Sequence, residues 1–176
     1  MRGENLNREN RDQRALRQWL TAGLQIPAVV SLAGDAGYLL NNMVAKYSLA
    51  ARNYALSVAA SEALLKSGVG LDRTYPRRRF YGRDSPFIYE HAIPAGIVRD
   101  ALLRSDRSER TVGDILSRSG PVAVLLRDED ARIRAAGLAR RMPANWSFGD
   151  DPLARYQAVG IQLSSEVLHV TGAIVR

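Results

Sequence analysis

The longest periodic segment of the chain runs from Tyr38 to Lys66, and it constrains the fold more than any other feature. Apolar residues recur there at helical spacing, with few charges and no proline, until Gly68 and Gly70. This spacing predicts one helix over about 38–66, roughly 40 Å long at about 1.5 Å per residue. Such a helix would be the spine of the fold. Its apolar surface would also suit a protein partner or a second copy of the chain.

Shorter apolar runs follow this segment and predict a mixture of strands and helices. The chain has 176 residues, 46% of them hydrophobic, which fits one domain with a sizeable core. We therefore predict a helix-dominated α+β fold, with 1–16 as a basic, disordered arm and 17–176 as a single globular domain. The predicted strands are 86–89, 122–126 and 167–175, and the predicted shorter helices are 95–103 and 129–142.

Arginine dominates the charge of the chain. The 25 basic residues outnumber the 18 acidic ones, giving a net charge of +7, and all but Lys46 and Lys66 are arginine. This excess favours a polyanionic partner, and the guanidinium group suits bidentate phosphate contacts. A genome-wide preference for arginine would give the same total, and an anionic membrane surface would attract the same charge. The positions of the arginines are therefore more informative than their number.

Basic and aromatic side chains alternate between Tyr75 and Arg83. Arginines in such a segment can neutralise a phosphate backbone, and the rings between them can stack on unpaired bases. The alternative is a solvated loop. We predict that this segment binds nucleic acid, either DNA or RNA, through six residues: Arg77, Arg78, Arg79, Phe80, Tyr81 and Arg83.

The lack of cysteine, and of signal-peptide or membrane-spanning segments, narrows the classes of protein to which the chain could belong. The chain contains no cysteine, which excludes disulfides, thiolate nucleophiles and cysteine-ligated zinc, so any metal would need oxygen and histidine ligands. The first 17 residues are polar and do not resemble a signal peptide, and no uninterrupted apolar stretch could span a bilayer. We therefore expect a cytoplasmic protein without a membrane partner.

Glu90 and His91 place a carboxylate beside one of the two histidines, where a strand-like run ends before Pro94. Such a pair can serve metal-assisted phosphodiester chemistry. Alternatively, His91 is a half-buried structural histidine and Glu90 an ordinary ion-pair partner of Arg77 or Arg78. The other histidine, His169, lies in an apolar strand-like run and is interpreted as a packed residue outside the site.

The order of elements around this pair resembles that of HNH nucleases, also called ββα-metal or His-Me finger nucleases. One strand ends in Glu90-His91, the strand 122–126 follows, and a helix then opens at Asp128-Glu129-Asp130. The resemblance implies a small ββα-like hairpin–helix unit. The connection between the two strands is longer than in compact members of the family, and it contains no asparagine to orient the base.

The resemblance also implies roles for individual residues. His91 would be the general base, since imidazole titrates near neutrality. Glu90 would be a ligand of a divalent metal, expected to be Mg²⁺, and Asp130 is the first choice for the second ligand, with Asp128 and Glu129 as alternatives. Because the helix lacks the family's usual histidine ligand, a non-catalytic DNA- or RNA-binding module, or a structural subunit of a larger nucleoprotein complex, remains the alternative function.

Overall fold

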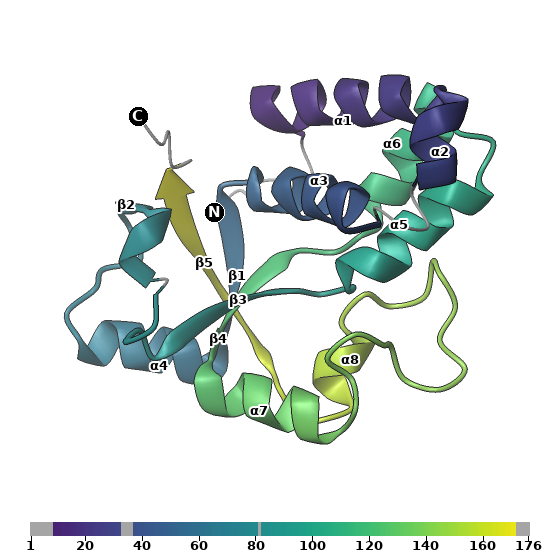
Figure 1. Cartoon of the computed structure of the whole chain (residues 1–176). Coiled ribbons are helices and arrows are strands. Elements are labelled where there is room, and N and C mark those ends of the chain that lie inside the picture. Colours follow the sequence, from purple (N-terminus) through teal and green to yellow (C-terminus); the bar gives the residue numbers. More distant parts are fainter. Residues whose placement is uncertain (1–8, 33–36, 81, 172–176) are drawn as a thin grey trace. The chain divides into compact units, whose positions relative to one another are not determined.

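The computed structural model describes residues 9–32, 37–80 and 82–171. They form two compact units: a helical unit of residues 9–51 and 95–119, and a sheet unit of residues 52–94 and 120–171 (Figure 1). Helices account for 49% of the structure and strands for 17%, which confirms the helix-dominated α+β class. The assignment of 17–176 to one domain stays a prediction.

The helical unit has a core built from the apolar faces of helices from two separate parts of the chain. Helices α1 and α3 pack with α5 and α6, and α2 contacts α1. The helices are α1 (Arg11–Leu24), α2 (Pro27–Leu32), α3 (Gly37–Leu49), α5 (Ala95–Arg104) and α6 (Glu109–Ser117). Their buried residues include Leu20, Leu24, Leu40, Val44, Tyr47, Val98, Leu102, Val112 and Leu116.

The beginning of α1 corrects the predicted N-terminal arm. The side chain of Asn10 accepts a hydrogen bond from the backbone N–H of Gln13, and the Gln13 side chain accepts one from the backbone of Asn10. This reciprocal capping box stabilises a helix that starts at Arg11. The arm predicted over 1–16 is therefore wrong from Asn10 onward, because polar capping residues were interpreted as a solvated tail. Residues 1–8 lie outside the described residues.

The sheet unit contains one five-stranded mixed sheet of order β2-β5-β1-β4-β3. β1 runs parallel to β4 and β2 runs parallel to β5, whereas the β1–β5 and β3–β4 pairs are antiparallel. The strands are β1 (Asn53–Ser57), β2 (Thr74–Pro76), β3 (Phe87–His91), β4 (Val122–Leu126) and β5 (Leu163–Thr171). The helices of this unit are α4 (Val58–Lys66), the 3₁₀ helix η1 (Arg77–Phe80), α7 (Arg127–Ala135) and α8 (Ala154–Gln157).

The predicted ββα-like unit is present. β3 pairs with β4 from Phe87 opposite Leu126 to His91 opposite Val122, and α7 follows β4 directly. α7 packs on both strands. One face of the sheet carries a core cluster shared with α7 and α8, consisting of Ala92, Ala123, Leu125, Ile133, Tyr156 and Ile161. The long connection between the two strands contains α5 and α6, which belong to the helical unit.

The helix predicted over 38–66 is wrong, because the chain forms α3, β1 and α4 there. Arg52 adopts a left-handed backbone conformation with φ of 62°, which ends the helical path. Tyr54 and Leu56 are then fully buried on alternate positions of β1, a strand period hidden within the helical spacing. Ser57 caps α4. A protein partner or second copy of the chain at this segment stays a prediction, now without the single long helix.

Three element boundaries also differ from the prediction. β5 begins at Leu163 and so earlier than predicted, while residues 172–176 lie outside the described residues. α7 ends at Ala135, because Gly137 follows in the left-handed conformation typical of a helix C-terminus. Its N-terminus is capped by the Glu129 carboxylate, which accepts from the backbone N–H of Leu126, and not by Asp128. None of the described helices is long and apolar enough to cross a membrane.

Candidate functional site

The end of β3 positions Glu90 and His91 at an edge of the sheet. β3 is an outer strand, with β4 as its neighbour on one side. Successive side chains of a strand point to opposite faces, so Glu90 shares a face with Ile88, which packs against the cluster beneath α7 and α8. The carboxylate of Glu90 therefore faces the two helices.

α7 brings Asp130 to the same place. The carboxylate of Asp130 is close enough to Glu90 that its charge contributes to raising the pKa of Glu90, although burial is the larger cause. Glu129 is instead engaged at the start of the helix, where it accepts from the Ser57 hydroxyl at 2.6 Å and from the Leu126 amide at 2.9 Å. Asp128 is exposed. Of the three candidate carboxylates, Asp130 is the one whose charge acts on Glu90.

Sequence reasoning missed the ion-pair partner of Glu90. Arg155 on α8 donates from one terminal nitrogen, Nη2, to Glu90 Oε2 and to the carbonyl oxygen of His91, both at 2.5 Å. The suggested partners Arg77 and Arg78 are not the residues that pair with it in the structure. The sequence did contain one signal: Arg155 lies in the largely apolar stretch 153–161, where a buried arginine requires a carboxylate or carbonyl partner.

The electrostatics of the pair follow from burial and from Arg155. Burial raises the pKa of Glu90, while the nearby guanidinium of Arg155 counteracts this shift. Burial lowers the pKa of His91 to about 4, and the positive charge of Arg155 acts in the same direction. The imidazole of His91 is therefore neutral at neutral pH. His169 lies apart from this site, on β5, where its Nδ1 is 3.0 Å from Asn53 Oδ1.

The donor atoms fit Mg²⁺ in their chemistry. Mg²⁺ prefers oxygen ligands and is typically held by one or two carboxylates together with several waters. Arg155 occupies one oxygen of Glu90, and Arg134 occupies Oδ2 of Asp130 at 2.7 Å. The second oxygen of each carboxylate has no hydrogen bond within the described ranges. Among those residues, no group of three or more His, Cys, Asp or Glu side chains that could hold a metal ion is assembled.

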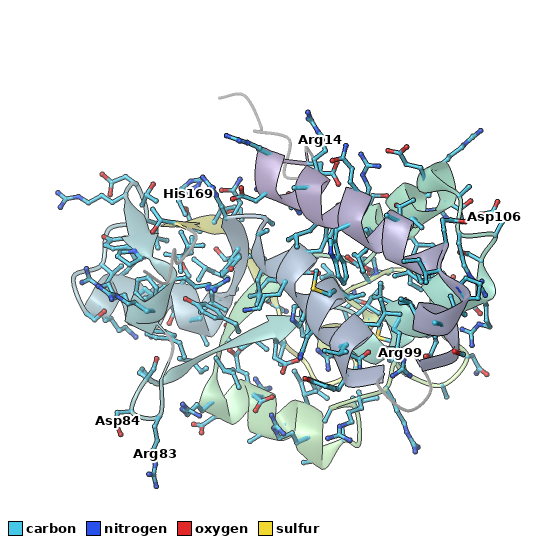
Figure 2. The ribbon with its side chains drawn as sticks, turned by 45° about the horizontal axis from the view of Figure 1, so that its top comes forward. Arg14, Arg83, Asp84, Arg99, Asp106 and His169 are labelled. Carbon is cyan, nitrogen blue, oxygen red and sulfur yellow. The ribbon has the colours of Figure 1, made fainter. Side chains whose placement is uncertain are left out.

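The predicted nucleic-acid segment divides into exposed and buried residues. Arg78, Arg79 and Arg83 are exposed, and Arg77 is half-buried. In Figure 2 the side chain of Arg83 projects away from the ribbon, next to that of Asp84. Arg127, the first residue of α7, donates to the carbonyl oxygens of Ser85 and Gly82 at 2.6 Å, so this loop is held beside α7.

The prediction that Phe80 stacks on bases is wrong for this arrangement. Its ring is 3% exposed and packs edge-on against Tyr75 and Phe87, with ring centroids 5.5 and 6.2 Å away. Aromatic spacing in a basic segment fits either a stacking surface or a core contact, and here the rings form a core. Arg79 lies over the Tyr75 ring, with its guanidinium carbon 4.8 Å from the centroid. Tyr81 lies outside the described residues.

No protein-family model matches the chain, and neither a curated protein nor a solved structure matches it. The resemblance to HNH nucleases stays a prediction. It depends on the residues around Glu90 and on the hairpin–helix unit.

Proposed function

We propose that the protein binds nucleic acid and hydrolyses phosphodiester bonds with the help of a divalent metal ion. The observation that carries this proposal is that α7, which bears Asp130, packs against β3, which ends with Glu90 and His91. Two carboxylates can hold one divalent ion for phosphodiester chemistry, and His91 follows Glu90 directly in the chain.

His91 is the proposed general base. A base must be unprotonated before it can take a proton from the attacking water, and the pKa of His91, lowered to about 4 by burial, keeps the imidazole neutral. Glu90 and Asp130 would hold the metal through the carboxylate oxygens that Arg155 and Arg134 leave unbound. When bound, the metal would supply positive charge to the scissile phosphate.

The exposed arginines Arg78, Arg79 and Arg83 are the proposed phosphate contacts. Arginines free of buried partners can neutralise backbone phosphates without a desolvation cost in the protein core. Arg127 contributes indirectly, because it fixes the loop of Arg83 to the start of α7. The phosphate contacts and the carboxylate pair thus involve the same helix.

A cleavage assay with two variants, in each of which one histidine is replaced, tests the proposal. Wild type, His91→Ala and His169→Ala are incubated with DNA and RNA substrates in Mg²⁺, in Mn²⁺ and in EDTA, and products are followed on a gel. We expect metal-dependent cleavage by wild type and His169→Ala, and loss of cleavage by His91→Ala with nucleic-acid binding retained. Equal cleavage by wild type and His91→Ala would contradict the assignment of His91 as the general base.

A non-catalytic nucleic-acid-binding module is the second candidate, and one observation favours it. Both carboxylates already have a guanidinium partner, since Arg155 pairs with Glu90 and Arg134 pairs with Asp130. The cluster is therefore neutralised without any metal. A protein of this kind would bind nucleic acid with a steep salt dependence and would not need a divalent ion.

The exposed arginines allow a direct test of this second candidate. Replacing Arg78, Arg79 and Arg83 together by glutamine should weaken binding to all sequences about equally and reduce its salt dependence. The matched control replaces three exposed arginines of the helical unit, Arg11, Arg14 and Arg110, which changes the net charge by the same amount. Equal losses in both triple variants would mean that total charge, and not this segment, drives binding.

A further inference from the structure

Arg155 connects two segments of the sheet unit that carry the proposed site. Its Nη2 donates to Glu90 Oε2 and to the His91 carbonyl oxygen, both at 2.5 Å. Its Nη1 donates to the carbonyl oxygens of Leu138 and Ala139, at 3.0 and 3.3 Å. One planar group thus ties the end of β3 to the segment that follows α7.

This connection bears directly on the two carboxylates. Glu90 belongs to β3, and Asp130 belongs to α7, which ends at Ala135 shortly before Leu138 and Ala139. A guanidinium group is rigid, so its two terminal nitrogens fix the spacing of the acceptors on either side. Arg155 therefore fixes the end of β3, which carries Glu90, relative to the segment that follows α7.

The neighbouring residue on α8 reinforces this contact. Tyr156 is fully buried in the cluster between the sheet, α7 and α8, and its hydroxyl donates to the carbonyl oxygen of Glu90 at 3.3 Å. Because β3 is an outer strand, groups on its free edge need donors from elsewhere in the chain. Two consecutive residues of α8 thus hold Glu90 and His91.

The energetics of Arg155 argue for more than stability. Its side chain is 1% exposed, and its Nε has no hydrogen-bond partner among the described atoms. A buried donor left without a partner costs about 1–3 kcal/mol. A buried ion pair is often no more stabilising than apolar residues of the same volume. The Arg155 guanidinium holds its acceptor atoms at fixed positions, which an apolar side chain of the same volume could not do.

We propose that Arg155 is a positioning residue that sets Glu90 against Asp130, with Tyr156 in a smaller supporting role. This inference rests on the proposed function, because it assigns Arg155 to the same site. Residues that orient metal-binding carboxylates typically change metal affinity or activity by about 10- to 100-fold when they are replaced.

The test uses the full-length chain with Arg155→Lys, which keeps the charge and loses the planar fork. The matched control is Arg132→Lys, since Arg132 also donates to a main-chain carbonyl, that of Val159, but its side chain is 51% exposed and does not bind Glu90. Four quantities are measured: the melting temperature, the Kd for a labelled oligonucleotide in EDTA, the affinity for Mn²⁺ alone, and the single-turnover cleavage rate.

We expect Arg155→Lys to lose about 10- to 100-fold in both Mn²⁺ affinity and cleavage rate, with the oligonucleotide Kd unchanged. Arg132→Lys should resemble wild type in all four measurements. A folded Arg155→Lys variant with wild-type Mn²⁺ affinity and cleavage would overturn the inference. Equal losses in the Arg132→Lys control would do the same.

Tyr156→Phe provides the test if Arg155→Lys does not melt cooperatively. It removes a single hydroxyl, and we expect about a 5-fold loss of cleavage with unchanged oligonucleotide binding, the effect of one hydrogen bond. A wild-type cleavage rate in this variant would overturn the inference. Failure of the proposed function is distinguishable, because wild type itself would then show no cleavage that depends on His91.

Discussion

The two carboxylates of the site have the same kind of partner in opposite surroundings. Glu90 pairs with Arg155, whose side chain is 1% exposed, whereas Asp130 pairs with Arg134, whose side chain is 60% exposed. The Asp130 pair joins residues four apart on one helix, and its arginine faces water although the Asp130 side chain is 12% exposed. The buried pair joins segments far apart in the chain. Burial therefore holds Arg155 in one position, whereas Arg134 can be replaced at a smaller cost in stability.

Removing the buried arginine should have the largest effect on stability. Arg155→Met leaves Glu90 without its ion pair and three carbonyl oxygens without the Arg155 donor, and breaking a buried pair costs about 3–5 kcal/mol. Urea unfolding of wild type and Arg155→Met at pH 7 gives the difference in free energy of unfolding. Arg132→Met is the control and should change it little. A loss below about 1 kcal/mol for Arg155→Met would contradict the contrast between the two pairs.

Crowding the buried pair should come next. Gly120 has φ of 75°, and a Cβ there would lie 2.8 Å from the Cβ atoms of both Ala92 and Pro152. Those residues adjoin the segments of Glu90 and Arg155, so Gly120→Ala should push the segments apart. We expect a loss of about 3 kcal/mol from backbone strain and displaced atoms together.

A second glycine separates strain from crowding. Gly160 also has a positive φ, of 68°, but no atom lies within 4 Å of a Cβ built there. Thermal or urea unfolding of Gly160→Ala should therefore show the loss due to backbone strain, about 1–3 kcal/mol, without the crowding. Equal losses in Gly120→Ala and Gly160→Ala would show that the contact with Ala92 and Pro152 is unimportant.

The pH dependence of stability should report the burial of His91. Its pKa is lowered to about 4 in the folded chain, so between pH 6.5 and 4 the unfolded chain binds a proton that the folded chain does not. The contribution of His91 to the free energy of unfolding is therefore complete above about pH 6.5. It is lost as the pH falls toward 4, and the loss is at most about 3 kcal/mol. Glu90 has a raised pKa, and its contribution has the opposite sign, falling as the pH rises above its ordinary value.

Comparison of variants isolates the contribution of His91. Urea unfolding at several pH values between 4 and 7 should show a shallower acid decline for His91→Gln than for wild type. His169→Gln should keep the decline of wild type. Parallel curves for wild type and His91→Gln would contradict the burial of a neutral imidazole at the end of β3.

The Asp130–Arg134 pair should give the smallest effect. Arg134→Gln removes the partner of Asp130; an ion pair of this spacing on a helix contributes about 0.3–0.5 kcal/mol, and the burial of Asp130 adds to the loss. Urea unfolding in low and high salt measures it, and added salt should shrink the difference further. A loss as large as that of Arg155→Met would remove the distinction between the two arginines.

The sequence was sufficient to predict the hairpin–helix unit but not the residue that supports it, Arg155. The strands around Tyr89 and Val124 are short apolar runs bounded by turn residues, and the acidic run 128–130 marks the first turn of a helix. Arg155 could not be placed, because α8 spans four residues and has no detectable period. Its partners Glu90 and His91 are more than 60 residues away in the chain.

Two further misses have the same kind of cause. Arg52 ends α3 in a left-handed conformation without the glycine that usually marks such an end, so the sequence there reads as an uninterrupted helix. Phe80 is buried by partners from outside its own segment, and its local context is strongly basic. Local sequence patterns predict individual helices and strands. Where an element ends, and which of its side chains are buried, depends on contacts with residues far away in the chain.

The insertion of α5 and α6 between β3 and β4 has a consequence for folding kinetics. His91 and Val122 pair across a connection of helices and not across a tight turn, so closing this hairpin costs far more chain entropy than a two-residue turn would. We expect the pairing to form late and the two helices to form early, since local contacts form faster than distant ones. Substitutions in α5 or α6 would then slow assembly of the Glu90 site without touching any residue in it.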